Sequence, residues 1–243
     1  MHHLISRHGR LLRVVGSLLG LALCTTTWSA DQVSMNTMEQ RVQPCMACHA
    51  EQGIDLQSGF VPSLHGKPAG YLFNQLMNYR DGRRNHRAME YMVRNLSPDY
   101  LQEIAEYFAG LEGEYPQPAD PPTSTALRER ADELITRGDP SRDIPACIAC
   151  HGERLTGAQP NTPGLLGLPS HYVAAQMTSW RSGQRRAAEP DCMQQIADRL
   201  GSEDVYALAR ALAARDVPAE PLPEPEPLAD LPMECGSVPI PES

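Results

Sequence analysis

Two short segments carry residue types that bind metals and cofactors, namely Cys45-Met46-Ala47-Cys48-His49 and Cys147-Ile148-Ala149-Cys150-His151. In each segment two thiols lie three positions apart and a histidine follows directly. This spacing is typical of covalent haem attachment, in which both cysteines form thioethers to the porphyrin and the histidine binds the iron. The sequence therefore predicts two covalently bound haem c groups, held by Cys45 and Cys48 and by Cys147 and Cys150, with His49 and His151 as iron ligands.

Two other kinds of site use paired cysteines. Four cysteines in two such pairs can bind one zinc ion, and a single pair can act as a redox dithiol. Neither chemistry needs a histidine directly after each pair. Each pair is also followed by methionines well downstream, and the chain begins like an exported protein. Haem is therefore favoured over zinc and over dithiol chemistry.

A haem iron that has one histidine ligand takes its character from the opposite axial position. A buried methionine there raises the reduction potential and closes the site. The candidates in the first half are Met77, Met89 and Met92. Met77 falls within a predicted helix, where core packing is expected. Met89 and Met193 each lie eight residues before the position that opens the last helix of their half, so we expect these two to be axial ligands, with Met92 as the main alternative.

The chain contains an internal duplication. The two Cys-x-x-Cys-His segments are 102 residues apart, and a further set of residues repeats at an offset of 101. Because order and spacing are kept, the repeat indicates two similar domains. The residues that repeat are Pro62, Leu64, Gly66, Tyr71, Gln75, Arg80 and Gly82, which correspond to Pro163, Leu165, Gly167, Tyr172, Gln176, Arg181 and Gly183.

Apolar residues in both halves recur at helical spacing. Ser97 is a suitable N-cap with Pro98 at the first helical position, and no segment shows the alternation expected of strands. We therefore expect an all-α fold with two tandem domains, each wrapped around one covalent haem. The predicted helices are 38–48, 69–80 and 98–111 in the first half, and 126–137, 171–181 and 203–214 in the second.

The two ends of the chain differ from its middle. Three arginines and no acid precede an apolar run at 14–23, which predicts a signal peptide over 1–30 and a periplasmic protein; an uncleaved anchor and a lipoprotein cysteine at Cys24 are the alternatives. Prolines at 116–122 predict a stiff linker, and a proline-rich acidic segment from 217 predicts an extended or disordered tail. The expected boundaries are 31–114 for the first domain, 115–125 for the linker, 126–216 for the second domain and 217–243 for the tail.

Composition limits the partners. The net charge is −9, and Lys67 is the only lysine. An acidic chain of this kind argues against nucleic acid and anionic lipid, so we expect contact with a membrane only through partners, and redox proteins with a basic patch as those partners. Only 3 Phe and 2 Trp are present, which is few for two protein cores. Two haems would supply apolar bulk, so we expect the apoprotein to fold poorly.

The ordered set of motifs resembles the dihaem cytochromes of the cytochrome c4 group over roughly Met35 to Ala214. The resemblance implies that the carbonyls of Pro62 and Pro163 accept hydrogen bonds from His49 and His151. It also implies that Arg80 and Arg181, in the two Arg-x-Gly-x-Arg turns, lie near haem propionates. The second half departs from the pattern in three places, with three extra residues before its methionine, Gly201 in place of a capping serine, and Cys192 beside Met193.

Two cysteines remain outside the haem segments once Cys24 leaves with the signal peptide. In an oxidising compartment, a disulfide between Cys192 and Cys235 is the simplest account, and it would fasten the tail to the methionine loop of the second domain. Free thiols are one alternative. A Cys192 thiolate that binds iron in place of Met193 is another, and it would lower the potential of that haem.

These features predict an electron carrier and not an enzyme. The sequence shows no acid–base or nucleophile constellation apart from Cys192. The resemblance implies a respiratory complex as electron donor and a terminal oxidase as acceptor. The alternatives are a dihaem oxidoreductase, or the haem subunit of one, acting on peroxide or on sulfur compounds with one exchangeable axial site, and an assembly subunit that docks through its tail.

Overall fold

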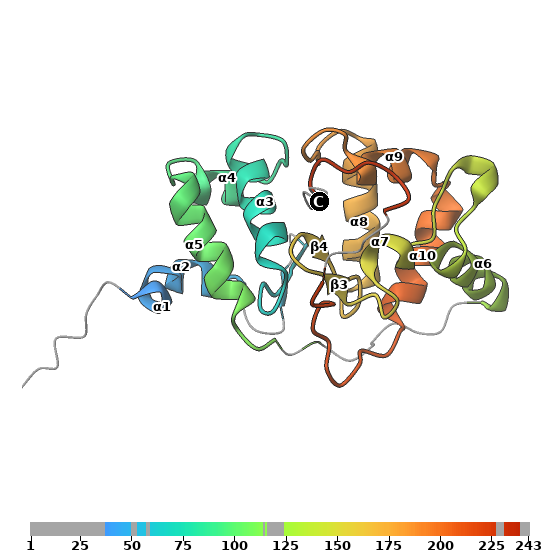
Figure 1. Ribbon diagram of the computed structural model, residues 1–243, viewed down its shortest axis with the longest axis horizontal. Coiled ribbons are helices and arrows are strands. Elements are labelled where there is room, and N and C mark those ends of the chain that lie inside the picture. Colours follow the sequence, from blue (N-terminus) through green and yellow to red (C-terminus); the bar gives the residue numbers. More distant parts are fainter. Residues whose placement is uncertain are drawn as a thin grey trace, which may run out of the picture. The chain divides into compact units, whose positions relative to one another are not determined.

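The computed structural model describes residues 37–49, 53–56, 59–113, 115, 124–226 and 231–238. The predicted signal peptide, 1–30, lies outside these residues, as does the predicted linker apart from Tyr115 and 124–125. Figure 1 shows the helices and the short strands that follow one another along the chain. Within the described ranges, no helix is both long enough and apolar enough to cross a membrane.

Each half of the chain has its own set of helices. Two of them match closely between the halves, since α3 and α8 are offset by 101 residues and α5 and α10 by 104, with 12 residues in each. The first half contains α1 (Met38–Arg41), α2 (Gln43–Met46), α3 (Ala69–Arg80), α4 (Arg87–Val93) and α5 (Pro98–Ala109). The second contains α6 (Thr125–Thr136), the 3-10 turn η1 (Pro140–Arg142), α7 (Ile148–His151), α8 (Ser170–Arg181), α9 (Cys192–Arg199) and α10 (Ser202–Ala213).

The expected helix over 38–48 is divided into α1 and α2. Pro44 lies in the first turn of α2, where its missing amide costs nothing, so that α2 begins as a new helix after Val42. The start of α5 agrees with its prediction, because the Ser97 side chain accepts a hydrogen bond from the Tyr100 amide at 3.3 Å. Short helices thus hold the first Cys-x-x-Cys-His segment next to the packed pair α3 and α5.

Two hydrophobic cores form, one from each half. In the first half Leu101 and Phe108 on α5 are fully buried against Leu72 of α3. In the second, Leu134 and Ile135 of α6 pack with residues of α8 and α10. Separate cores are what a duplicated fold requires, and they confirm the expected pair of tandem helical domains.

Two pairs of short strands were not predicted. β1 (Ile54–Leu56) pairs antiparallel with β2 (Gly59–Val61), and β3 (Gly157–Ala158) pairs with β4 (Thr162–Pro163). Strands of two or three residues are too short to show alternation in the sequence. Each pair follows a Cys-x-x-Cys-His segment and leads to Pro62 or Pro163, so the strands place those prolines beside the histidines.

The tail is extended where the structure describes it, as expected, and it is anchored. Glu224 joins the edge of β3, where its amide donates to Gly157 at 2.9 Å and its carbonyl accepts from the Gln159 amide at 2.9 Å. The Glu224 carboxylate also accepts from the Glu153 amide at 3.0 Å. The prolines of this segment keep it extended. The backbone hydrogen bonds of Glu224 fix its place on the second domain.

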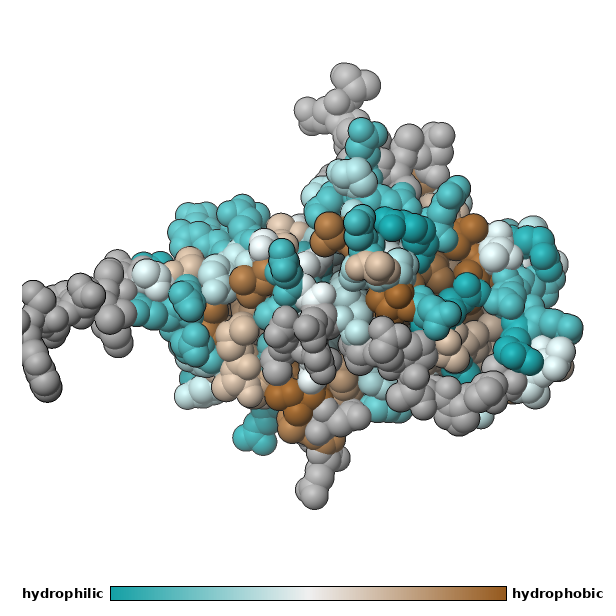
Figure 2. Space-filling model, turned by 90° about the horizontal axis from the view of Figure 1, so that it is seen from below, coloured by the Kyte–Doolittle hydropathy of each residue, from teal (hydrophilic) through white to brown (hydrophobic). Residues whose placement is uncertain are grey.

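The surface retains apolar groups. On the face shown in Figure 2, hydrophobic residues form patches between hydrophilic ones. Large exposed apolar side chains in the described ranges are Leu56, Tyr91, Met92, Tyr206 and Leu222.

Candidate haem sites

The first candidate site is built around His49, which follows α2. Its Nδ1 lies 2.8 Å from the Pro62 carbonyl oxygen, at the end of β2. A carbonyl only accepts, so Nδ1 carries the hydrogen and the lone pair of the neutral ring is on Nε2. Burial lowers the pKa of His49, which favours this neutral form. The ring therefore offers Nε2 as a metal ligand in a fixed orientation.

The second candidate site repeats this arrangement. The Nδ1 of His151, the last residue of α7, lies 2.8 Å from the Pro163 carbonyl oxygen of β4. His151 is buried, and burial lowers its pKa as well. The hydrogen bonds that the family resemblance implied are thus present at both sites, and they put both imidazoles in the state that binds iron.

Three of the cysteines in the two segments have thiols whose pKa is shifted away from that of a redox-active cysteine. Burial raises the pKa of Cys45 and of Cys150, and raises that of Cys147 to about 11. A redox-active cysteine needs the opposite shift, because the thiolate is the reactive form. Nor do the described residues bring three or more His, Cys, Asp or Glu side chains together as a metal cluster, so the four thiols do not assemble a shared zinc site.

The candidate axial methionines lie on two helices that the sequence analysis did not predict. Met89 is on α4, where it packs against the first core. Met92 on the same helix is 42% exposed, and Met77 packs into the core from α3. Burial thus favours Met89 over Met92. Met193 is the second residue of α9, whose N-cap is the buried Asp191.

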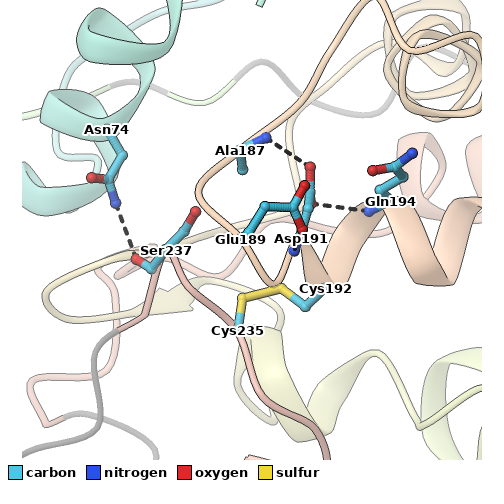
Figure 3. The surroundings of a disulfide bond; sticks show 8 residues. All are labelled: Asn74, Ala187, Glu189, Asp191, Cys192, Gln194, Cys235 and Ser237. Atoms are coloured by element: carbon cyan, nitrogen blue, oxygen red, sulfur yellow. Dashed lines mark hydrogen bonds between the residues drawn. A yellow bond between two sulfur atoms is a disulfide. The ribbon is translucent and has the colours of Figure 1, made fainter. Parts of the chain in front are cut away.

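Cys192 does not present a thiol next to Met193. It forms a disulfide with Cys235, as the sequence analysis favoured, and Figure 3 shows this bond at the start of α9. A disulfide sulfur is not a thiolate ligand, so in this state Cys192 does not compete with Met193 for iron.

Two arginines and two glutamines from equivalent positions of the repeat meet between the domains. The Arg84 guanidinium donates to Gln75 and to Gln176, both at 2.8 Å. The Arg185 guanidinium donates to the same two oxygens, at 2.8 Å to Gln176 and 3.2 Å to Gln75. Each arginine thus bridges its own domain and the other. The repeated Gln in the sequence was the signal for this network, and its role was not recognised there.

Backbone hydrogen bonds extend this contact between the two domains, which we call the seam. The Asn85 amide donates to Gln184 at 2.8 Å, and the Arg186 amide donates to Arg83 at 2.7 Å. At the other end of α3, the Tyr71 amide donates to the Pro160 carbonyl at 3.2 Å. The domains are therefore joined along α3 and the loop after it.

The two turn arginines named in the sequence analysis are less buried than a second pair in the same turns. Arg80 pairs with Asp81 at 3.0 Å, and Arg181 is exposed. The buried positions belong instead to Arg84 and Arg185, four residues further along in each turn. Neither Arg84 nor Arg185 forms an ion pair with a carboxylate among the described residues. Burial and the like charge of Arg84 lower the pKa of Arg185.

These features fit haem. Arg84 and Arg185 are buried with glutamine and tyrosine oxygens as their partners and no carboxylate among the described residues, so the propionates of a haem would suit this pair of cations. The buried indole Nε1 of Trp180 also has no hydrogen-bond partner in the described structure, and its ring lies 3.7 Å from the Arg185 guanidinium carbon. The donor set of cysteine pairs, a neutral histidine and a downstream methionine completes the match at each site.

Comparisons with known proteins agree with these features. The chain is 36% identical over 198 residues to a thiosulfate dehydrogenase electron acceptor of Thiomonas intermedia, covering 82% of this chain and 90% of that protein. It is 32% identical to a cytochrome c4 of Pseudomonas aeruginosa, covering 81% of this chain and 94% of that one. No protein-family model matches the sequence.

The fold is similar to that of solved structures. One is a thiosulfate dehydrogenase (TsdBA) of Marichromatium purpuratum, with a TM-score of 0.61 and 32% identity over 70% of this chain. The match spans 36% of that protein, so this chain corresponds to about a third of it.

Proposed function

This chain belongs to the family of dihaem cytochromes that includes cytochrome c4, and from that membership we propose that it is a periplasmic carrier of single electrons from a thiosulfate dehydrogenase to a respiratory acceptor. Its cofactors are two covalently bound haem c groups, and it transfers electrons without transforming a substrate itself. The observation that carries this proposal is the identical histidine–proline geometry, which presents one imidazole nitrogen for an iron in each domain.

We propose the following roles for the site residues. Cys45 and Cys48 hold one haem, and Cys147 and Cys150 hold the other. His49 and Met89 would bind the iron of the first haem, and His151 and Met193 would bind that of the second. When bound, haem supplies a one-electron ferric–ferrous couple.

The chain's own residues then set the conditions for transfer. The Pro62 and Pro163 carbonyls hold the imidazoles, and this fixed orientation keeps reorganisation small. With Met89 and Met193 bound to the two irons, small-molecule substrates would find no free position on either iron. Arg84 and Arg185, buried at the contact between the domains, would offer their charge to the propionates of a bound haem.

The proposed electron donor rests on what a relative is called, an electron acceptor of thiosulfate dehydrogenase. The test mixes the oxidised holoprotein with a purified thiosulfate dehydrogenase and thiosulfate, with each omitted in turn as controls. We expect both haems to become ferrous only in the complete mixture. Reduction by a respiratory quinol-oxidising complex, with no reduction in the thiosulfate mixture, would instead identify the second candidate donor.

The closed axial positions are tested separately. We expect the oxidised holoprotein to show two low-spin haems with the methionine-to-iron charge-transfer band. The reduced protein should not bind carbon monoxide. A haem that is high-spin or binds carbon monoxide would contradict the carrier role and favour the alternative of a dihaem oxidoreductase with one exchangeable site.

A further inference from the structure

Residues near the end of the tail contact the start of α9, close to the second candidate haem site. Cys235 is 43 residues beyond Cys192, and their disulfide fixes residues 231–238 to the first residue of α9. We name residues 231–238 the C-terminal clamp. Met193, the proposed iron ligand, is the next residue after the one that the clamp holds.

The clamp also packs on the segment that leads into α9. The Gly236 amide donates to the Pro190 carbonyl at 2.9 Å. The Gly236 backbone lies so close to this segment that an added Cβ would be 2.3 Å from the Glu189 carbonyl oxygen. Only glycine fits at this position, which means that the contact is built into the sequence of the clamp.

Asp191 holds the same segment from within. Its carboxylate accepts from the Ala187 amide at 2.7 Å and from the Gln194 amide at 3.1 Å, and Glu189 accepts from the Asp191 amide at 3.1 Å. Figure 3 shows these bonds around the disulfide. The segment that leads to Met193 is therefore held by hydrogen bonds within its own turn and by its contacts with the clamp.

Among the described residues of the first domain, α4 has no such restraint. The residue before Met89 is Ala88, and α4 starts with the exposed His86 as N-cap, whose ring accepts from the Met89 amide at 3.4 Å. The clamp does reach this domain at another point, because the Asn74 side chain on α3 donates to the Ser237 carbonyl at 3.0 Å. Covalent restraint of the methionine helix is thus specific to the second site.

We infer that the Cys192–Cys235 disulfide and its clamp are positioning residues for Met193, and that they keep the second haem closed. The inference rests on the proposed function, since it requires Met193 to be the iron ligand. The second loop before the methionine is three residues longer than the first, and a longer loop samples more conformations unless it is restrained. The disulfide removes that freedom at the residue next to the ligand.

The test compares the wild-type holoprotein with a Cys192→Ser/Cys235→Ser variant that keeps both haems. In the variant we expect one haem of the two to lose its methionine-to-iron band and to bind carbon monoxide when reduced. The other haem should be unchanged. Asn74→Ala is the matched control, because it removes the contact of the clamp with the first domain and leaves the disulfide intact, so both haems should stay closed.

A second measurement avoids any failure of the variant to mature. A phosphine reduces the disulfide in the folded wild-type holoprotein, taking an oxygen atom from water to become the phosphine oxide, while each cysteine gains an electron and a proton. Iodoacetamide then alkylates the two thiols, whereas the haem thioethers do not react with the phosphine. We expect the treated protein to gain one carbon monoxide-binding haem, as the variant does.

Met193→Ala separates failure of the inference from failure of the ligand assignment. If this variant opens the second haem while both disulfide-free proteins stay closed, Met193 is the ligand and the clamp does not position it. If Met193→Ala leaves both haems closed, the ligand assignment itself is wrong and the inference falls with it.

Discussion

At the scale of single residues, the cysteine pairs and the histidines could be proposed as haem-attachment segments because Cys-x-x-Cys-His is a short-range pattern, whereas the role of the prolines came from the family resemblance. Cys-x-x-Cys-His needs one helical turn, and the repeat then located Pro62 and Pro163. The sequence did not distinguish the arginines of each turn by burial, since Arg80 and Arg84 have the same chemistry and only the structure shows that Arg84 is enclosed. A sequence pattern gives the turn but not the direction of its side chains.

The choice between Met89 and Met92 leads to a prediction at this scale. Met89→Ala removes a methionine that packs in the core, whereas Met92 is 42% exposed. We therefore expect Met89→Ala to abolish the charge-transfer band of the first haem, to let that haem bind carbon monoxide, and to lower its reduction potential. Met92→Ala should change none of these properties. Spectra and redox titrations of both holoproteins provide the measurement, and the reverse result would make Met92 the ligand.

At the scale of elements, the long helices were predicted and the short ones were not. α3, α5, α8 and α10 each have 12 residues, enough for three turns of apolar spacing. α4 and α9 have 7 and 8 residues, which is too short for a clear repeat of apolar residues. Their N-caps, His86 and Asp191, were therefore not recognised as helix starts in the sequence. Both helices form because tertiary contacts hold them, and this is why the proposed axial methionines were located by the repeat and not by periodicity.

An ionic cluster holds the elements of the second domain together and gives a pH prediction. Asp204 at the start of α10 accepts from Arg130 of α6 and from Arg142 of η1, both at 2.8 Å. Burial on its own would raise the pKa of Asp204, but the two arginines outweigh it and hold that pKa below its ordinary value. The unfolded chain therefore binds a proton more readily than the folded one. The stabilisation is complete above pH about 4 and is lost as the pH falls below it.

Asp204→Asn tests this stabilisation at constant size. We expect it to lower the free energy of unfolding by about 2 kcal/mol at neutral pH, with a difference from wild type that shrinks as the pH falls below about 4. Urea titrations of both holoproteins across this pH range give the result. Asp132→Asn is the control, because Asp132 pairs with Arg215 at the surface with 58% of its side chain exposed, and such a pair contributes little. Equal losses in the two variants would show that the buried cluster has no special role.

At the scale of the whole molecule, the duplication predicted two domains but not how they join. Gln75 and Gln176 were visible as a repeated pair, yet a repeat within each half says nothing about contact between the halves. The seam depends on residues distant in sequence, such as Phe60 and Tyr172, whose rings meet edge to face at 5.5 Å between centroids. The anchoring of the tail at Glu224 likewise depends on the exposed edge of β3, which no local pattern reveals.

Gly70 gives the sharpest test of this seam. It lies in the first turn of α3, where an added Cβ would be 2.8 Å from the Pro160 carbonyl oxygen of the second domain, and within contact of Asn161. Gly70→Ala must therefore push α3 away from that loop and weaken the hydrogen bond from the Tyr71 amide to Pro160. We expect a loss of about 2 kcal/mol in the free energy of unfolding, the usual cost of overpacking.

Gly110→Ala is the matched control for this substitution. Gly110 ends α5 in a right-handed helical conformation, and its added Cβ would be 3.6 Å from the nearest atoms, an ordinary contact. Alanine at this position restricts the unfolded chain without strain, so we expect a gain of about 0.5 kcal/mol instead of a loss. Thermal unfolding of the two holoproteins measures both effects. Slower electron exchange between the haems in Gly70→Ala alone would tie the loss to the seam, whereas equal exchange rates in the two variants would show that transfer does not depend on this contact.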